Sequence, residues 1–257
     1  MSLLGQPNHT LLMTGLFAET YRIGSRVKKV YRKYPNDDVA TAESIRATRN
    51  EASIYILLGD HPRIAKCLFV EPAKTYIELD YYPKGNLKSF IERRGPNIED
   101  THRKRWARQI IESAEYIHSM GVWHSDFRLE QWLLDETLNA RLSDFNASGY
   151  NRNVALSLEG SETMAVEDAS HFLPRDVADD STVESDLFAL GSTLFELMTG
   201  GAPYDGQSRE SIEARFMEGA FPSVEGLLLG EAITRCWTKR FLSAKEVLKF
   251  GQKAYGL

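Results

Sequence analysis

Cysteine is scarce in this chain, and long apolar runs are missing. The two cysteines, Cys67 and Cys236, stand far apart and form no CxxC pair. Neither a disulfide framework nor a zinc site is implied, and we expect reduced thiols in the cytosol or the nucleus. Every apolar run ends before the roughly 18 residues that a membrane helix needs. The start, Met1 to Pro7, is too short an apolar stretch for a signal peptide, so we expect no membrane partner.

An excess of positive charge is also missing. The chain has 31 lysines and arginines against 36 aspartates and glutamates, a formal net charge of −5. Because bulk attraction to phosphate backbones requires a basic surface, we expect no nucleic-acid partner. The 257 residues are 42% hydrophobic and 26% charged. These values suit a soluble globular protein that is long enough for one large domain or two lobes.

The apolar pattern changes near Tyr82, from strands with one helix to a mainly helical remainder. The expected strands are Leu11–Tyr21, Arg26–Tyr31, Lys66–Val70 and Thr75–Tyr81, and the expected helices are Thr41–Leu58, Leu87–Arg93, Thr101–Met120 and Glu184–Thr199. We therefore expect an α+β fold of two lobes, residues 1–82 and 83–257, with a cleft between them.

Two segments in the middle of the chain combine acids and an amide. One contains Asp126 and Gln131, and the other places Asp144-Phe145 eighteen residues after Asp126. Phosphoryl transfer needs a lysine on the phosphates, carboxylates or amides on magnesium, and an acid beside the incoming hydroxyl. Taken alone, each aspartate is more often a surface or capping residue. Taken together, they indicate this chemistry.

These segments resemble the catalytic and metal-binding loops of the eukaryotic protein kinases, with several letters changed. The resemblance implies a bilobal protein kinase fold, ATP and Mg²⁺ (or Mn²⁺) as cofactors, and a protein as substrate or partner. It makes Asp126 the acceptor of the substrate hydroxyl proton and Arg128 its helper beside the γ-phosphate. It makes Asp144 and Gln131 the metal ligands. The resemblance extends from about Leu11 to Leu248.

Upstream, Val27-x-Lys29 resembles the family's phosphate-binding lysine motif, and Glu51 its partner on the regulatory helix. Because strand side chains alternate, Lys29 is expected to point into the cleft and Lys28 away, although a one-residue slip would exchange them. An exposed ion pair is the alternative for Lys29 and Glu51. Asp186 resembles the buried family aspartate that receives the backbone of the catalytic loop.

The resemblance also assigns a nucleotide pocket. Gly15 and Phe17 fall in the glycine-rich lid. Leu79, Asp80 and Tyr82 fall in the hinge, where Leu79 takes the gatekeeper position and Tyr82 offers backbone groups to adenine. The lid keeps one of the three usual glycines. Because backbone amides approach phosphate closely only where side chains do not intervene, we expect weak nucleotide binding.

Several substitutions depart from the family pattern. Ser125 replaces the arginine that reads a phosphorylated activation loop, so activity is not expected to need that phosphorylation. Gln131 replaces an asparagine, and its extra methylene predicts a rate lowered by about 100- to 1000-fold. Asn146 replaces a glycine but tolerates left-handed backbone angles. Arg175 replaces a glutamate and must find a carboxylate or face water.

We therefore expect a serine/threonine protein kinase that transfers the γ-phosphate of ATP to a protein hydroxyl, slowly and without activation-loop phosphorylation. The motifs, with Asp-Phe-Asn for Asp-Phe-Gly, are similar to a divergent branch of kinase-like sequences in filamentous fungi. The alternative is a pseudokinase, which would act as a nucleotide-binding or scaffolding module. A third reading is a small-molecule phosphotransferase, whose loop can also contain His-x-Asp. Neither the substrate nor the oligomeric state follows from the sequence.

Overall fold

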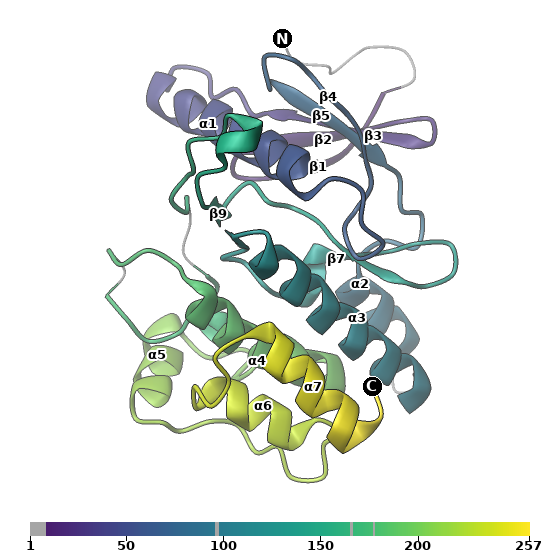
Figure 1. The fold of residues 1–257 in the computed structure, drawn as a ribbon, viewed down its shortest axis with the longest axis vertical. Helices are drawn as coiled ribbons and strands as arrows, with labels where there is room; N and C mark the ends of the chain where they lie inside the picture. Colours follow the sequence, from purple (N-terminus) through teal and green to yellow (C-terminus); the bar gives the residue numbers. More distant parts are fainter. Residues whose placement is uncertain (1–8, 96–97, 165–166, 177) are drawn as a thin grey trace.

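The chain folds into two lobes, a sheet-rich N-terminal lobe and a helical C-terminal lobe, drawn above and below in Figure 1. The computed structural model describes residues 9–95, 98–164, 167–176 and 178–257. The expectation about Met1 to Pro7 therefore lies outside the described residues. The smaller lobe holds one sheet and a long helix, and the larger lobe is mainly helical, which confirms the expected α+β class.

The upper lobe is built on one antiparallel sheet with the strand order β1-β2-β3-β5-β4. Its strands are β1 (Thr10–Thr14), β2 (Ala18–Ile23), β3 (Arg26–Tyr31), β4 (Cys67–Val70) and β5 (Tyr76–Asp80). Helix α1 (Asp38–Leu58) packs against β3, β4 and β5. Asp37 caps its start, because the Asp37 carboxylate accepts a hydrogen bond from the N–H of Ala40. Gly59 caps its end, with a φ of 62° that suits glycine.

Tight turns connect the first three strands. Gly24, with a φ of 63°, closes the β2–β3 hairpin. The expectation of one strand over Leu11–Tyr21 is wrong. The Gly15 N–H donates to the carbonyl of Ala18 at 2.8 Å, which closes a turn and divides the segment into β1 and β2.

The lower lobe contains six helices among its described residues. They are α2 (Leu87–Arg94), α3 (Asp100–Ser119), α4 (Val183–Thr199), α5 (Arg209–Met217), α6 (Gly230–Trp237) and α7 (Ala244–Tyr255). The expected helices match α2, α3 and α4 to within one residue at each end. Helix α4 starts from a capping box between Thr182 and Ser185 and is buried along most of its length. Gly191 lets α6 approach α4, because a Cβ there would lie 2.7 Å from the Cβ of Cys236.

Two short antiparallel sheets hold the loops between α3 and α4. They pair β6 (Val122–Trp123) with β9 (Gly149–Tyr150), and β7 (Trp132–Leu134) with β8 (Ala140–Leu142). The β7–β8 pair holds the residues that follow Asp126 beside those that precede Asp144, so paired strands support the loops that carry both acids.

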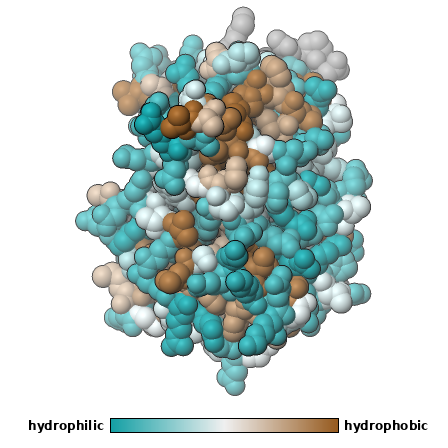
Figure 2. Space-filling model, viewed as in Figure 1, coloured by the Kyte–Doolittle hydropathy of each residue, from teal (hydrophilic) through white to brown (hydrophobic). Residues whose placement is uncertain are grey.

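The molecular surface differs between the lobes. On the face seen in Figure 2, apolar side chains gather over the upper lobe, while the lower lobe is mostly hydrophilic. Exposed apolar residues on the edge strands β1 and β4 include Leu11, Leu12, Met13, Leu68 and Phe69. Within the described part of the chain, no helix combines the length and the apolar character needed to cross a membrane.

Candidate active site

A cavity of about 380 Å³ lies between the β1–β2 turn and the loops that carry the acids. Lys29 lines it from the upper lobe, and Asp126, Arg128 and Asp144 line it from the lower lobe. Lys29 and Asp144 are 115 residues apart in the sequence but in direct contact. The fold therefore gathers a cation and two carboxylates from distant segments at one cleft.

Lys29 on β3 is buried and contacts two carboxylates. Its Nζ lies 2.9 Å from Glu51 of α1 and 2.6 Å from Oδ1 of Asp144. Burial lowers the pKa of a lysine, but the charges of Asp144 and Glu51 outweigh it and raise the pKa of Lys29 above its ordinary value. The side chain is therefore a permanent cation. Lys28 points elsewhere, since its Nζ lies 3.5 Å from the centroid of the Tyr76 ring.

Asp144 is fixed by the residue that follows it. The N–H of Phe145 donates to Glu51 at 3.1 Å, and its buried ring packs edge-on against Tyr55 with the centroids 5.3 Å apart. Asp144 has a φ of 66°, in a region that aspartate enters more readily than most residues. Burial favours the neutral acid, but the Lys29 ammonium outweighs it and holds the pKa of Asp144 below its ordinary value.

Asn50 of α1 ties this helix to the same loop, and sequence reasoning missed it. Its buried Nδ2 donates to the carbonyl of Ser148 at 2.6 Å. A buried asparagine is unusual, but nothing in a single sequence separates it from an exposed one on the same helix. Together with the Glu51–Phe145 contact, it holds α1 of the upper lobe against a loop of the lower lobe.

An ion pair and a hydrogen bond hold the carboxylate of Asp126. The Nε of Arg128 lies 3.1 Å from Oδ1, and the side-chain amide of Gln131 donates to Oδ2. Burial raises the pKa of Asp126 to about 7, although these two neighbours act in the opposite direction. A carboxylate with this pKa is suited to accept a proton near neutral pH.

Asp186 of α4 is completely buried and holds the loop that leads to Asp126. Its carboxylate accepts hydrogen bonds from the backbone N–H groups of His124 at 2.7 Å and Ser125 at 2.9 Å. His118 adds a contact at 2.9 Å, where the imidazole Nε2 must be the donor. Sequence reasoning did not single out His118. Ser125 adopts a φ of 66°, and its hydroxyl is buried with no hydrogen-bond partner in the described residues.

The residues expected to bind nucleotide are only partly brought together. Gly15 and Phe17 line the cavity, whereas Leu79, Asp80 and Tyr82 do not. The side chains of Leu79 and Tyr82 are buried, with 6% and 8% of each residue exposed. Any contact from Leu79 or Tyr82 to a ligand in the cleft therefore falls to backbone groups.

The substituted positions 146 and 175 behave differently. Asn146 does not use its tolerance of left-handed angles, because Asp144 is the residue of this loop with a positive φ. Arg175 does find a carboxylate, since its Nη2 lies 2.8 Å from Glu167. Sequence reasoning did not single out Glu167, because the partner of an arginine depends on the path of the backbone.

The oxygen donors in the cleft suit a hard divalent cation. The described residues contain no group of three or more histidines, cysteines or acids that is able to hold a metal by itself. Magnesium usually binds through one or two carboxylates, with waters and substrate phosphates supplying the remaining ligands. Asp144 lines the cavity and keeps 26% of its side chain exposed, whereas Gln131 is buried and is not among the residues that line the cavity. The carboxylate of Asp144 fits Mg²⁺.

Comparison with known proteins gives a match over most of the chain. The family model described as protein kinase domain matches residues 10–248. Serine/threonine-protein kinase PrkC of Bacillus subtilis (strain 168) is 30% identical over 196 residues, which cover 75% of this chain and 29% of that protein.

Two further relatives are of similar closeness. NUAK family SNF1-like kinase 2 of Rattus norvegicus is 28% identical over 72% of this chain and 29% of its own length. 3-phosphoinositide-dependent protein kinase 1 of Mus musculus is 29% identical over 68% of this chain and 34% of its own length. The chain thus spans about a third or less of the length of these curated relatives.

Proposed function

Because the chain belongs to the protein kinase family, we propose that it transfers the γ-phosphate of ATP to a serine or threonine hydroxyl of a protein substrate. The observation that carries this proposal is the contact of Lys29 with Glu51 and Asp144, at 2.9 and 2.6 Å, in the cavity that Asp126 lines. Phosphoryl transfer depends mainly on positioning and on charge, and these groups supply both.

Each side chain has a role in this proposal. Lys29 binds the phosphates, and Glu51 holds the lysine in place. Asp126 accepts the proton of the incoming hydroxyl, while Arg128 keeps the carboxylate oriented and offsets charge beside the γ-phosphate. Asp144 and Gln131 would hold Mg²⁺, which when bound neutralises the charge that develops on the transferred group.

The nucleotide lies along the boundary between the lobes in this proposal, which we set at Tyr82, between residues 1–82 and 83–257. Gly15 and Phe17 cover the phosphates, and the backbone from Leu79 through Asp80 to Tyr82 faces the adenine. The serine/threonine type is supported by the names of relatives such as PrkC and by the cation at position 128.

A low rate is part of the proposal. Gln131 is one methylene longer than asparagine, and its amide nitrogen already donates to Asp126. One misplaced electrostatic contact typically costs about 100- to 1000-fold in rate. We expect Gln131→Asn to raise kcat at saturating Mg-ATP by about tenfold or more. A kcat that stays equal or falls would remove this explanation.

A pseudokinase is the second candidate, and the contact between Gln131 and Asp126 favours it. The amide of Gln131 is engaged by Asp126, and the lid retains only Gly15 of the usual glycines. A protein of this kind would bind nucleotide, or a partner protein, without transferring phosphate.

Nucleotide binding helps to separate these candidates. ATP with Mg²⁺ or Mn²⁺ at a hundredfold excess over its Kd adds about 2.7 kcal/mol to the free energy of unfolding. For a domain of this size the melting temperature should rise by roughly 5 to 10 °C. No shift with either metal favours the pseudokinase.

Phosphate transfer tests the proposal itself. The chain is incubated with γ-labelled ATP and casein, and the labelled amino acids are identified. We expect phosphoserine or phosphothreonine, absent with Asp126→Asn and with Asp144→Asn. Label on tyrosine alone would contradict the serine/threonine type, and no protein label from the wild type would contradict the kinase. Label that persists in both variants would indicate a contaminating kinase.

A further inference from the structure

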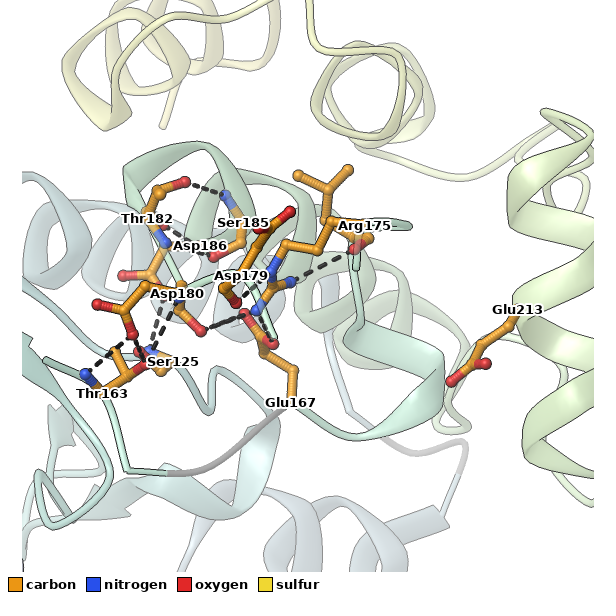
Figure 3. Close-up of polar contacts among 12 residues, drawn as sticks. Ser125, Thr163, Glu167, Arg175, Asp179, Asp180, Thr182, Ser185, Asp186 and Glu213 are labelled. Atoms are coloured by element: carbon orange, nitrogen blue, oxygen red, sulfur yellow. Dashed lines mark hydrogen bonds and ion pairs between the residues drawn. The ribbon is translucent and has the colours of Figure 1, made fainter. Parts of the chain in front are cut away.

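The segment between Thr163 and Ser181 contains a buried ion pair whose two members both belong to it (Figure 3). The Nη2 of Arg175 lies 2.8 Å from Glu167 and 2.9 Å from the hydroxyl of Ser181. That hydroxyl donates to the second oxygen of Glu167 at 3.1 Å. The Glu167 side chain is 0% exposed and that of Arg175 is 12% exposed, so water screens the pair little.

The remaining contacts of the guanidinium are also local. It donates to the carbonyls of Leu173 at 3.3 Å and Asp179 at 3.4 Å, and it lies 4.7 Å from the centroid of the Phe172 ring. Removing one member of a buried ion pair leaves the other charge uncompensated, which is strongly destabilising. The path of the segment therefore depends on Glu167 and Arg175 together.

The two ends of the segment are tied to each other, and its second end leads into a helix that supports the cleft. Near its start, the N–H and the hydroxyl of Thr163 donate to the carboxylate of Asp180. At its end, Ser181 directly precedes Thr182, the N-cap of α4. The first turn of that helix carries Asp186, which accepts hydrogen bonds from the loop before the acid of the cavity. Figure 3 shows Thr163, Asp180, Thr182 and Asp186 side by side.

Glu167 also sets the position of a charged part of the cavity wall. Its neighbour Asp168 lines the cavity beside Asp126 and Arg128. The carbonyl of Glu167 accepts a hydrogen bond from Arg209 of α5 at 3.4 Å. A shift of Glu167 would therefore displace an acidic side chain on the side of the cleft where a substrate hydroxyl must arrive.

We propose that Glu167, Arg175 and Ser181 are positioning residues that hold this wall in the arrangement that receives the protein substrate, without an added phosphate. The inference rests on the proposed kinase function and deepens it. Position 125 carries a serine and offers no cation to a phosphate. A phosphate on Thr163 would stand beside the carboxylate of Asp180 and repel it.

The test compares Arg175→Gln, Glu167→Gln and the double variant, using the full chain. Glutamine removes each charge but keeps length and hydrogen-bonding capacity. Each single variant is expected to raise the KM for casein about tenfold, with kcat and the KM for Mg-ATP within about twofold of wild type. The KM for casein of the double variant should rise no further than that of either single variant, because the effects of substituting two contacting residues are not additive. Arg235→Gln, which breaks an exposed pair with Glu231 on α6, is the matched control and should change nothing.

The inference is overturned if the casein KM of both single variants stays within twofold of wild type. It is also overturned if the two increases in the casein KM multiply in the double variant, or if the KM for Mg-ATP rises as much as that for casein. If the wild type transfers no phosphate, the kinase proposal has failed, and limited proteolysis tests the pair instead. Faster cleavage within residues 163–181 in each single variant supports the positioning role of the ion pair, and cleavage at the wild-type rate overturns it.

Discussion

Two adjacent lysines on β3 have different surroundings, which makes them a matched pair of test positions. Lys29 holds two carboxylates in the cleft, whereas Lys28 lies over an aromatic ring. We expect Lys29→Met to lower phosphate transfer at least 100-fold, as loss of one preorganised contact typically does. Lys28→Met should keep transfer within about twofold. Equal losses in the two variants would contradict the role assigned to Lys29.

The same substitution should also affect stability, because it leaves Glu51 buried with 1% of its side chain exposed. Breaking a buried pair typically costs about 3 to 5 kcal/mol. Adding Glu51→Gln removes the charge and keeps an acceptor for the Phe145 N–H, so the double variant should regain stability without regaining transfer. Chemical denaturation of both variants measures this difference.

The buried His171 should make the free energy of unfolding depend on pH. Burial lowers its pKa from 6.5 to about 4, with nearby charges on Asp168, Glu130, Arg128 and Lys88 adding smaller effects of both signs. Glu196 also lies close, at 3.8 Å from Nε2. Because the folded pKa is below the unfolded pKa, the contribution of His171 is complete above about pH 6.5. It is lost as pH falls toward 4, by about 2 to 3 kcal/mol at pH 4.5.

His171→Leu removes this titration, and the imidazole has no hydrogen-bond partner in the described residues that would be lost with it. Urea unfolding of the wild type and the variant at pH 7 and pH 4.5 isolates the histidine, since the other titrating groups are common to both. Their stability difference should change by about 2 to 3 kcal/mol in favour of the variant at the lower pH. A change below about 0.5 kcal/mol would show that the histidine is not held neutral.

At the residue scale, the sequence predicted which side chains lie at the site better than it predicted the contacts that they make. The convergence of Lys29, Glu51 and Asp144 was expected from the resemblance to the kinase motifs, and strand alternation selected Lys29 over Lys28. The amide contact of Gln131 could not, since it depends on a rotamer. The partner of Arg175 could not either, because it depends on the path of a long loop.

At the scale of elements, close approach of α4 and α6 depends on one glycine. A Cβ at Gly191 would lie 2.7 Å from the Cβ of Cys236 and 3.2 Å from the Trp237 ring. We expect Gly191→Ala to lower the free energy of unfolding by about 1 to 3 kcal/mol, as overpacking usually does. Gly201→Ala is the control, because its nearest atom would be 3.9 Å away. Similar losses in both variants would contradict this packing argument.

The bounds of α2, α3 and α4 were predictable because apolar periodicity is local. The apolar face expected over Glu184–Thr199 placed α4 to within one residue. The division of the first strand was not predicted, because the turn at Gly15 is closed by a backbone hydrogen bond with no distinctive side chain. The roles of Asn50 and His118 were not predicted either, since both act on backbone or carboxylate groups far away in the sequence.

At the scale of the whole molecule, the two lobes are joined through the site itself. Helix α1 of the upper lobe reaches the lower lobe through the Glu51–Phe145 and Asn50–Ser148 contacts. The change in pattern near Tyr82 was enough to predict two lobes and a cleft. The shape of the cleft was not predictable, because burial of Leu79 and Tyr82 follows from packing between segments distant in sequence.

The central claim is that Asp126 takes the proton of a protein hydroxyl in a cleft that binds Mg-ATP, and single-turnover transfer of the γ-phosphate to casein tests it most directly. We predict measurable transfer by the wild type, and transfer at least 100-fold slower by Asp126→Asn with the Mg-ATP thermal shift preserved, as expected for loss of a general base. Equal rates in wild type and variant, or no transfer by a wild type that binds Mg-ATP, would contradict the account.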